Sequence, residues 1–171
     1  MTMPAPWRKL VLVLHVTSSV GFIGAVAGFL ALAIAGLADT GPPALAVYPA
    51  MQVITWYVIV PLAASSLLVG ILQSLGTPWG LVRHYWVIVK LALTLLALAV
   101  LMLQTQSIDM LAEAALQGTL AEHAGARFSM VLHGTGGILV LLTATVLSIY
   151  KPRGITGYGA RAVAADRASP T

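Results

Sequence analysis

Cysteine is absent from the 171 residues of this chain. Its absence excludes disulfides, thiolate metal sites, iron–sulfur clusters and cysteine nucleophiles. Charged residues are also scarce, at 8% of the sequence, whereas an average soluble domain carries roughly a quarter. With five acidic residues and no basic run, nothing indicates a nucleic-acid surface.

Apolar residues take the place of the missing charges. They make up 59% of the chain, and the mean hydropathy is +0.95. A globular protein of this size could not bury so much apolar side chain, so lipid is the expected solvent. Four stretches are long enough to cross a hydrocarbon core of about 30 Å as helices: residues 10–37, 48–75, 81–103 and 128–150. We predict one all-α domain over residues 1–160, a four-helix transmembrane bundle.

The connections carry turn-forming residues. Residues 39–43 and 76–80 are rich in Gly and Pro, and Pro49 is predicted to lie in the opening turn of the second helix. Residues 107–126 form the one long connection, for which the apolar spacing predicts a short surface helix. Residues 161–171 are predicted to be a disordered cytoplasmic tail.

The basic residues predict the orientation. One side of the four-span arrangement holds nearly all of them: Arg8, Lys9, Arg83, Lys151, Arg153, Arg161 and Arg167. The other side holds Asp39, Asp109, Glu113 and Glu122, with Arg127 as its only cation. By the positive-inside rule, both termini are predicted to be cytoplasmic in a multi-pass protein of a bacterial plasma membrane.

Three histidines are candidate haem or metal ligands. His15 and His84 are predicted near the cytoplasmic end, and His133 near the opposite end. The helical rise separates His15 and His133 by roughly 10–15 Å in depth, so one shared group is not expected. An inner pair of His15 with His84 could hold b-type haem or copper, as paired helices do in membrane cytochromes. The alternatives are a hydrogen bond from His15 to another helix and an interfacial position for His84.

Arg83, Trp86, Lys90 and Thr94 share one face if the third helix begins near residue 81. Lys90 would then lie ~13 Å into the span. It could snorkel back to the headgroups, or the stripe could face the interior and bind an anionic group or lipid. No intramembrane carboxylate is available to pair with it.

Two further features of the sequence can each be interpreted in two ways. The glycines after His133 could pack against Gly21 and Gly28 of the first helix, or make room for a flat ligand. Glu113, Glu122 and His123 could join His133 around a divalent metal, although their spacing is not diagnostic. A third feature, Pro61, predicts a kink in the second helix because Tyr57 loses its usual hydrogen-bond partner.

Residues 77–90, with the sequence TPWGLVRHYWVIVK, and residues 150–154, YKPRG, resemble a four-helix membrane protein family of high-GC Gram-positive bacteria that has no assigned activity. The likeness covers about residues 8–160. More loosely, residues 14–16 are similar to the start of copper-resistance D-type membrane proteins, whose Trp-x-Gly-Gly element is replaced here by residues 20–24, VGFIG. No site is transferred on that basis.

The sequence contains no nucleotide-binding loop, nucleophile elbow or metalloprotease motif. It therefore favours a non-catalytic membrane component: an accessory subunit, a small transporter or a lipid-binding module centred on Arg83 and Lys90. Its partners would be the bilayer and either another membrane protein or further copies of the chain. The alternative is a haem- or metal-binding redox protein that uses the intramembrane histidines.

Overall fold

The computed structural model describes residues 3–38, 42–77 and 79–168. Its helices are α1 (Ala5–Ala38), α2 (Pro42–Ile54), the π turn η1 (Thr55–Ile59), α3 (Val60–Leu75), α4 (Tyr85–Gln117), the 3-10 turn η2 (Leu120–His123), α5 (Ala124–Tyr150) and α6 (Gly157–Ala168). The described residues form no strand, and His84 and Ile155 make an isolated antiparallel bridge. The predicted all-α four-helix bundle is confirmed.

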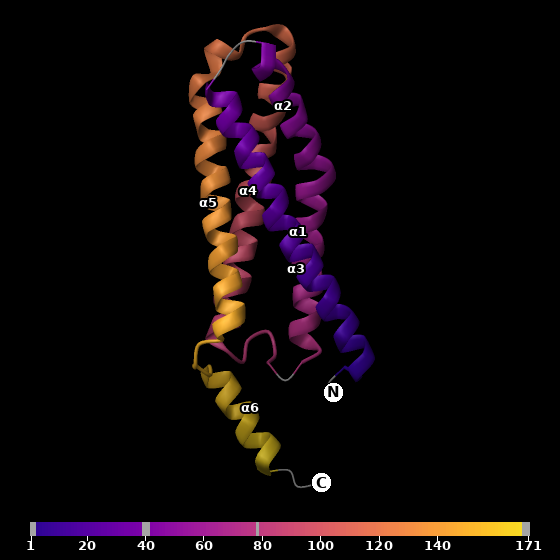
Figure 1. Ribbon diagram of the computed structural model, residues 1–171. Helices are drawn as coiled ribbons and strands as arrows, with labels where there is room; N and C mark the ends of the chain where they lie inside the picture. Colours follow the sequence, from indigo (N-terminus) through magenta and orange to yellow (C-terminus); the bar gives the residue numbers. More distant parts are fainter. Residues whose placement is uncertain (1–2, 39–41, 78, 169–171) are drawn as a thin grey trace.

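Four helical segments are long and apolar enough to cross a membrane: Ala5–Ala38, Leu45–Leu75, Tyr85–Gln117 and Leu120–Tyr150. Figure 1 shows the start of α1 and the whole of α6 at the same end of the bundle. We call this the terminal end and the opposite one the distal end. The architecture is that of a multi-pass membrane protein, and the cytoplasmic position of the terminal end stays a prediction.

The third span is longer than expected, because α4 continues to Gln117. The apolar spacing of Ile108, Leu111 and Ala115 does not belong to a separate surface helix, so that prediction is wrong. These side chains are 0–3% exposed and belong to the core, where α4 packs against α2 and α5. The helix ends at Gly118, whose φ of 74° is left-handed and favours glycine.

Three other boundaries differ from the predictions. α4 begins at Tyr85 and not at residue 81, since Gly80 turns with φ 61° and His84 is extended. α2 begins at Pro42, which leaves Pro49 inside the helix. In place of the disordered tail, α6 runs to Ala168; Thr156 starts it, because its hydroxyl accepts the N–H of Gly159 at 3.0 Å. Residues 39–41, 78 and 169–171, which take part in the predicted connections and tail, lie outside the described residues.

The irregularity predicted around Pro61 is a π turn. Pro61 cannot donate to the carbonyl of Tyr57, and the π turn Thr55–Ile59 ends two residues before this proline. Val60 donates instead to the carbonyl of Thr55, five residues back. The hydroxyl of the buried Thr55 bonds the carbonyl of Met51 at 2.7 Å.

The tightest packing lies toward the distal end. Several side chains there are 2% exposed or less: Ala33, Tyr48, Met51, Thr55, Leu111, Leu120 and Met130. α1 crosses the bundle obliquely (Figure 1) and packs against α3 and α5. The small-residue contact forms with other partners than predicted: Gly134 meets Leu30 rather than a glycine. The terminal half is more open, and a pocket lined by several polar side chains among apolar ones lies within it.

Candidate functional site

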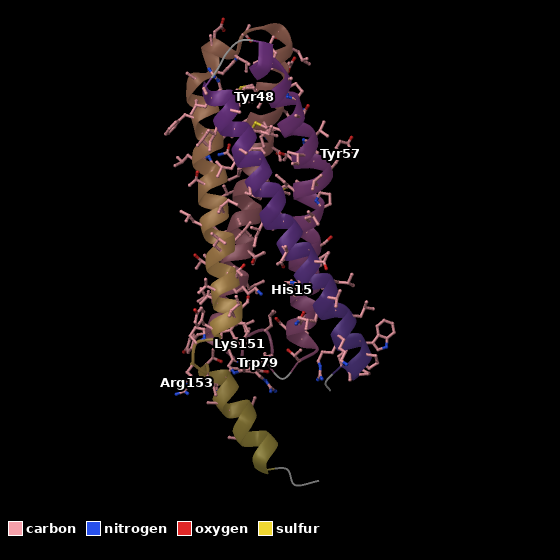
Figure 2. The ribbon with its side chains drawn as sticks, in the orientation of Figure 1. His15, Tyr48, Tyr57, Trp79, Lys151 and Arg153 are labelled. Carbon is pink, nitrogen blue, oxygen red and sulfur yellow. The ribbon has the colours of Figure 1, made fainter. Side chains whose placement is uncertain are left out.

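His15 of α1 and Lys90 of α4 meet inside the terminal half of the bundle. The Nζ of Lys90 lies 3.3 Å from the Nε2 of His15, across 75 residues of sequence. Figure 2 shows His15 at this level of the bundle, well away from Tyr48 at the distal end. Lys90 is five residues into α4, about 8 Å by helical rise, which is shallower than the ~13 Å expected. Its ammonium reaches across the bundle, toward α1.

The contact determines which nitrogen of His15 carries a proton. An ammonium group has three donors and no acceptor, so the Nε2 of His15 must accept. The proton of a neutral imidazole is then on Nδ1, which is buried; it makes no close hydrogen bond among the described residues, and the imidazole interacts only weakly with the backbone of Ser66. The Oε1 of Gln73 is a buried acceptor that has no hydrogen-bond partner among the described residues. Both residues line the same pocket. A ligand there could accept a hydrogen bond from His15 and donate one to Gln73.

This pocket has a volume of about 430 Å³ and lies between α1, α3, α4 and α5. We call it the basic pocket, because Lys90 and Lys151 line it and no Asp or Glu does among the described residues. Serine and threonine hydroxyls add to its polar wall: Ser19, Ser66, Ser74, Thr94, Thr145 and Ser148. Val20 and Ile149 are 63% and 70% exposed and form its exposed apolar edge. The pocket thus joins a cationic centre to an apolar flank.

Two close contacts shape the centre of the basic pocket. The hydroxyls of Ser19 and Ser66 are 2.8 Å apart and link α1 to α3. Gly70 faces the imidazole of His15, and a Cβ at this position would lie 2.9 Å from Cε1. A side chain at this position would therefore require the ring of His15 to shift.

The predicted stripe on the third helix is present only in part. Trp86, Lys90 and Thr94 line the basic pocket together. Arg83 precedes α4 and does not line it. The Arg83 side chain lies against Gly80, and its carbonyl accepts the N–H of Thr156 at 3.0 Å. The four-residue face fails because the helix starts four residues later than expected.

His84 is placed apart from His15. Its Nδ1 lies 2.9 Å from the carbonyl of Trp79. Its ring packs edge-on against the Trp79 indole, with 5.2 Å between the ring centroids. The Nζ of Lys151 lies 5.3 Å from the centre of the same indole, and Figure 2 shows both at the terminal end. His84 does not line the basic pocket, which holds His15. The two histidines therefore have separate surroundings.

His133 forms a second site, on α5. The Nε2 of Gln104 lies 2.8 Å from both of its ring nitrogens. Gln104 and Lys90 are fourteen residues apart on α4, about 21 Å by helical rise, so the contacts of His15 and His133 are farther apart than the depth count suggested. Within the described ranges, no three His, Asp or Glu side chains gather to hold a metal ion, including the predicted group around His123.

Two groups of polar contacts near the distal end were not predicted, and the first of them is buried. The guanidinium of Arg127 bonds the carbonyl of Gly36 at 2.7 Å, that of Leu37 at 3.1 Å and the hydroxyl of Tyr48 at 3.1 Å. It thereby binds the C-terminal end of α1. The carboxylate of Asp109 accepts from Gln52 at 2.9 Å and from the indole of Trp56 at 3.0 Å. The sequence signal for the contact of Arg127 was its position as the one cation on the side that was predicted to be otherwise acidic.

A second cavity, of about 370 Å³, lies beside His133. Phe22 of α1 and Leu141 of α5 line both this cavity and the basic pocket. They are 4% and 8% exposed and belong to the core. These two side chains are a shared wall of the two spaces.

Comparison with known proteins finds no matching family model, no matching curated protein and no matching solved structure. The two resemblances noted from the sequence therefore stay predictions, and the functional argument depends on the geometry.

Proposed function

We propose that this multi-pass membrane protein binds the anionic headgroup of a lipid-like amphiphile in the basic pocket. The ammonium of Lys90 is the observation that carries the proposal. It lies inside the bundle, its described partner is an uncharged imidazole, and the described lining contains no carboxylate. A charge placed within a bilayer costs ~2.5 kcal/mol or more, so an anionic partner would be strongly favoured there.

The rest of the lining suits an amphiphile better than a free ion. The Nδ1 proton of His15 and the Oε1 of Gln73 could bond headgroup oxygens and hydroxyls. Lys151 lies at the terminal end, where headgroups of the adjoining leaflet would be. The exposed apolar edge at Val20 and Ile149 could receive an acyl chain. The proposal therefore favours the lipid-binding role among the non-catalytic alternatives.

The test is a stability titration of the purified protein in an uncharged detergent. Added phosphatidylglycerol should stabilise the native state by about 2.7 kcal/mol at a hundredfold excess over Kd, and phosphatidylcholine should not. Lys90→Met should lose most of this increment. Lys9→Met is the matched control, since it removes the same charge from an exposed side chain of α1.

An inorganic phosphate titration separates the headgroup from the whole lipid. Stabilisation by phosphate alone would show that the pocket binds the anion without its acyl chains. Retention of the full phosphatidylglycerol effect in Lys90→Met would contradict the proposal. A Soret band or stoichiometric copper in the purified protein, lost in His15→Ala, would favour the haem or metal alternative.

A further inference from the structure

Gln73 of α3 brings a hydrogen-bond acceptor into a pocket whose charged side chains attract anions. Its Oε1 is buried and has no hydrogen-bond partner among the described residues, and the residue lines the basic pocket together with Lys90. An amide oxygen accepts hydrogen bonds and cannot donate them. Because a buried acceptor without a donor is unfavourable, a ligand that supplies a donor to this oxygen would be preferred.

The anion proposed for the basic pocket does not supply that donor itself. The phosphate of a lipid phosphodiester has only acceptor oxygens, so it would bond the ammonium of Lys90 and leave the Oε1 of Gln73 unsatisfied. A second group on the same ligand must donate to Gln73. An ammonium headgroup would bring a positive charge toward Lys151, which also lines the pocket and lies at the terminal end (Figure 2). An uncharged hydroxyl group avoids this repulsion.

The position of Gln73 along α3 places it on the headgroup side of the basic pocket. Ser66, Gly70 and Gln73 are spaced by four and three residues, so they share one face of α3. Gly70 is level with the imidazole of His15, because a Cβ there would lie 2.9 Å from Cε1. Gln73 lies three residues nearer the end of α3 at Leu75, about 4.5 Å by helical rise. Figure 1 shows this end of α3 at the terminal end of the bundle.

The same order runs through a lipid whose acyl chains point toward the bilayer centre. Its phosphate comes first, and the alcohol of its headgroup follows a few covalent bonds nearer the water. With the phosphate at the level of Lys90 and His15, which are 3.3 Å apart, the headgroup alcohol would reach the level of Gln73. One turn in the other direction, the hydroxyls of Ser19 and Ser66 bond each other at 2.8 Å. The unsatisfied acceptor is therefore on the side where the headgroup would be.

We infer that the basic pocket selects anionic lipids whose headgroup carries a free hydroxyl group, and that Gln73 recognises this hydroxyl. Glycerol and other polyol headgroups belong to this class. The inference rests on the proposed function, because Lys90 must hold the phosphate before Gln73 can distinguish what lies beyond it.

The experiment compares two lipids of equal charge in the stability titration. Phosphatidylpropanol keeps the phosphodiester and the carbon skeleton of the phosphatidylglycerol headgroup but lacks its hydroxyls. With matched acyl chains, phosphatidylglycerol should bind about threefold to tenfold more tightly, as expected for one net hydrogen bond. Gln73→Met should remove this difference by weakening phosphatidylglycerol. Gln106→Met is the matched control, since it removes the same amide from an exposed side chain of α4, and it should keep the difference.

The outcomes separate this inference from the proposed function. Equal affinity for the two lipids in the wild-type protein would overturn the inference and leave the binding of anionic headgroups in place. A preference that persists in Gln73→Met would overturn the assignment to Gln73. If that variant does not assemble, Gln73→Asn keeps the amide but withdraws it by one methylene, and it should reduce the preference. If neither lipid stabilises the wild-type protein, the proposed function fails and the inference fails with it.

Discussion

Replacing Arg127 by Met should destabilise the bundle more than any other single loss of charge. The guanidinium is 6% exposed and donates to the carbonyls of Gly36 and Leu37 and to the hydroxyl of Tyr48. The two carbonyls belong to the end of α1, where intrahelical donors run out and the helix dipole favours a cation. Met fills a similar volume but satisfies none of these groups.

The size of the effect follows from the kind of bond that is lost. Interhelical hydrogen bonds between neutral groups in membrane proteins average ~0.6 kcal/mol, so Tyr48→Phe should cost about 1 kcal/mol or less. A neutral acceptor that is left buried without its donor costs about 1–3 kcal/mol. Arg127→Met removes the donor from three such acceptors, so it should lower the free energy of unfolding by about 3–5 kcal/mol.

The assay is reversible unfolding in mixed micelles, followed by helicity as the fraction of denaturing detergent rises. Arg153→Met is the control, since Arg153 is exposed at the terminal end. Arg127→Lys keeps the charge but loses the planar fork that reaches two carbonyls, and it should fall between wild type and Arg127→Met. If Arg127→Met lowers the free energy of unfolding by less than about 1 kcal/mol, the reasoning is refuted. The contact would then contribute no more than one hydrogen bond between neutral groups.

Three further predictions concern single positions. Gly36→Ala should lower the free energy of unfolding by about 1–3 kcal/mol, since its Cβ would lie 3.0 Å from the ring of Tyr48; the same micelle titration measures it. Gly70→Ala should reduce stabilisation by phosphatidylglycerol, because its Cβ would lie 2.9 Å from the imidazole of His15 and displace it from Lys90. Thr156→Val should loosen α6 by removing the hydroxyl that caps it, so trypsin should cleave faster there while the four spans stay protected.

Each of these has a matched control. Gly24→Ala adds the same methyl group to α1 where nothing lies within 4 Å, and it should leave both stability and lipid binding unchanged. Thr143→Val removes a hydroxyl that bonds only its own helix, and it should not alter cleavage of α6. Equal effects in a variant and its control would show that the local contact is not the cause.

The spans were predictable from the sequence because their apolar length leaves no other stable arrangement in lipid. The ends of the helices were harder to predict from the sequence. Residues 107–117 are apolar at helical spacing both as a surface helix and as a continued core helix, and only the packing of Leu111 distinguishes the two. The helix Gly157–Ala168 was missed because its polar composition outweighed the capping threonine before it.

The candidate site was predictable only as separate residues. Depth counting placed His15 and Lys90 toward the same end, and the lack of an intramembrane carboxylate marked Lys90. That the two side chains meet depends on the rotation of α1 about its own axis, which a nearly uniform apolar helix does not reveal. The grouping of Arg83 with Lys90 failed for a local reason, since Gly80 and the extended His84 delay the start of α4.

The wall shared by Phe22 and Leu141 bears on how well the bundle insulates the membrane. On one side of it lies a space with two ammonium groups, where water and ions from the terminal end would be stabilised. On the other lies a space with no ionic side chain among its described residues, which reaches toward the distal end. Because Phe22 and Leu141 are both hydrocarbon side chains in the core, the wall itself offers an ion no hydrogen bond and no opposite charge.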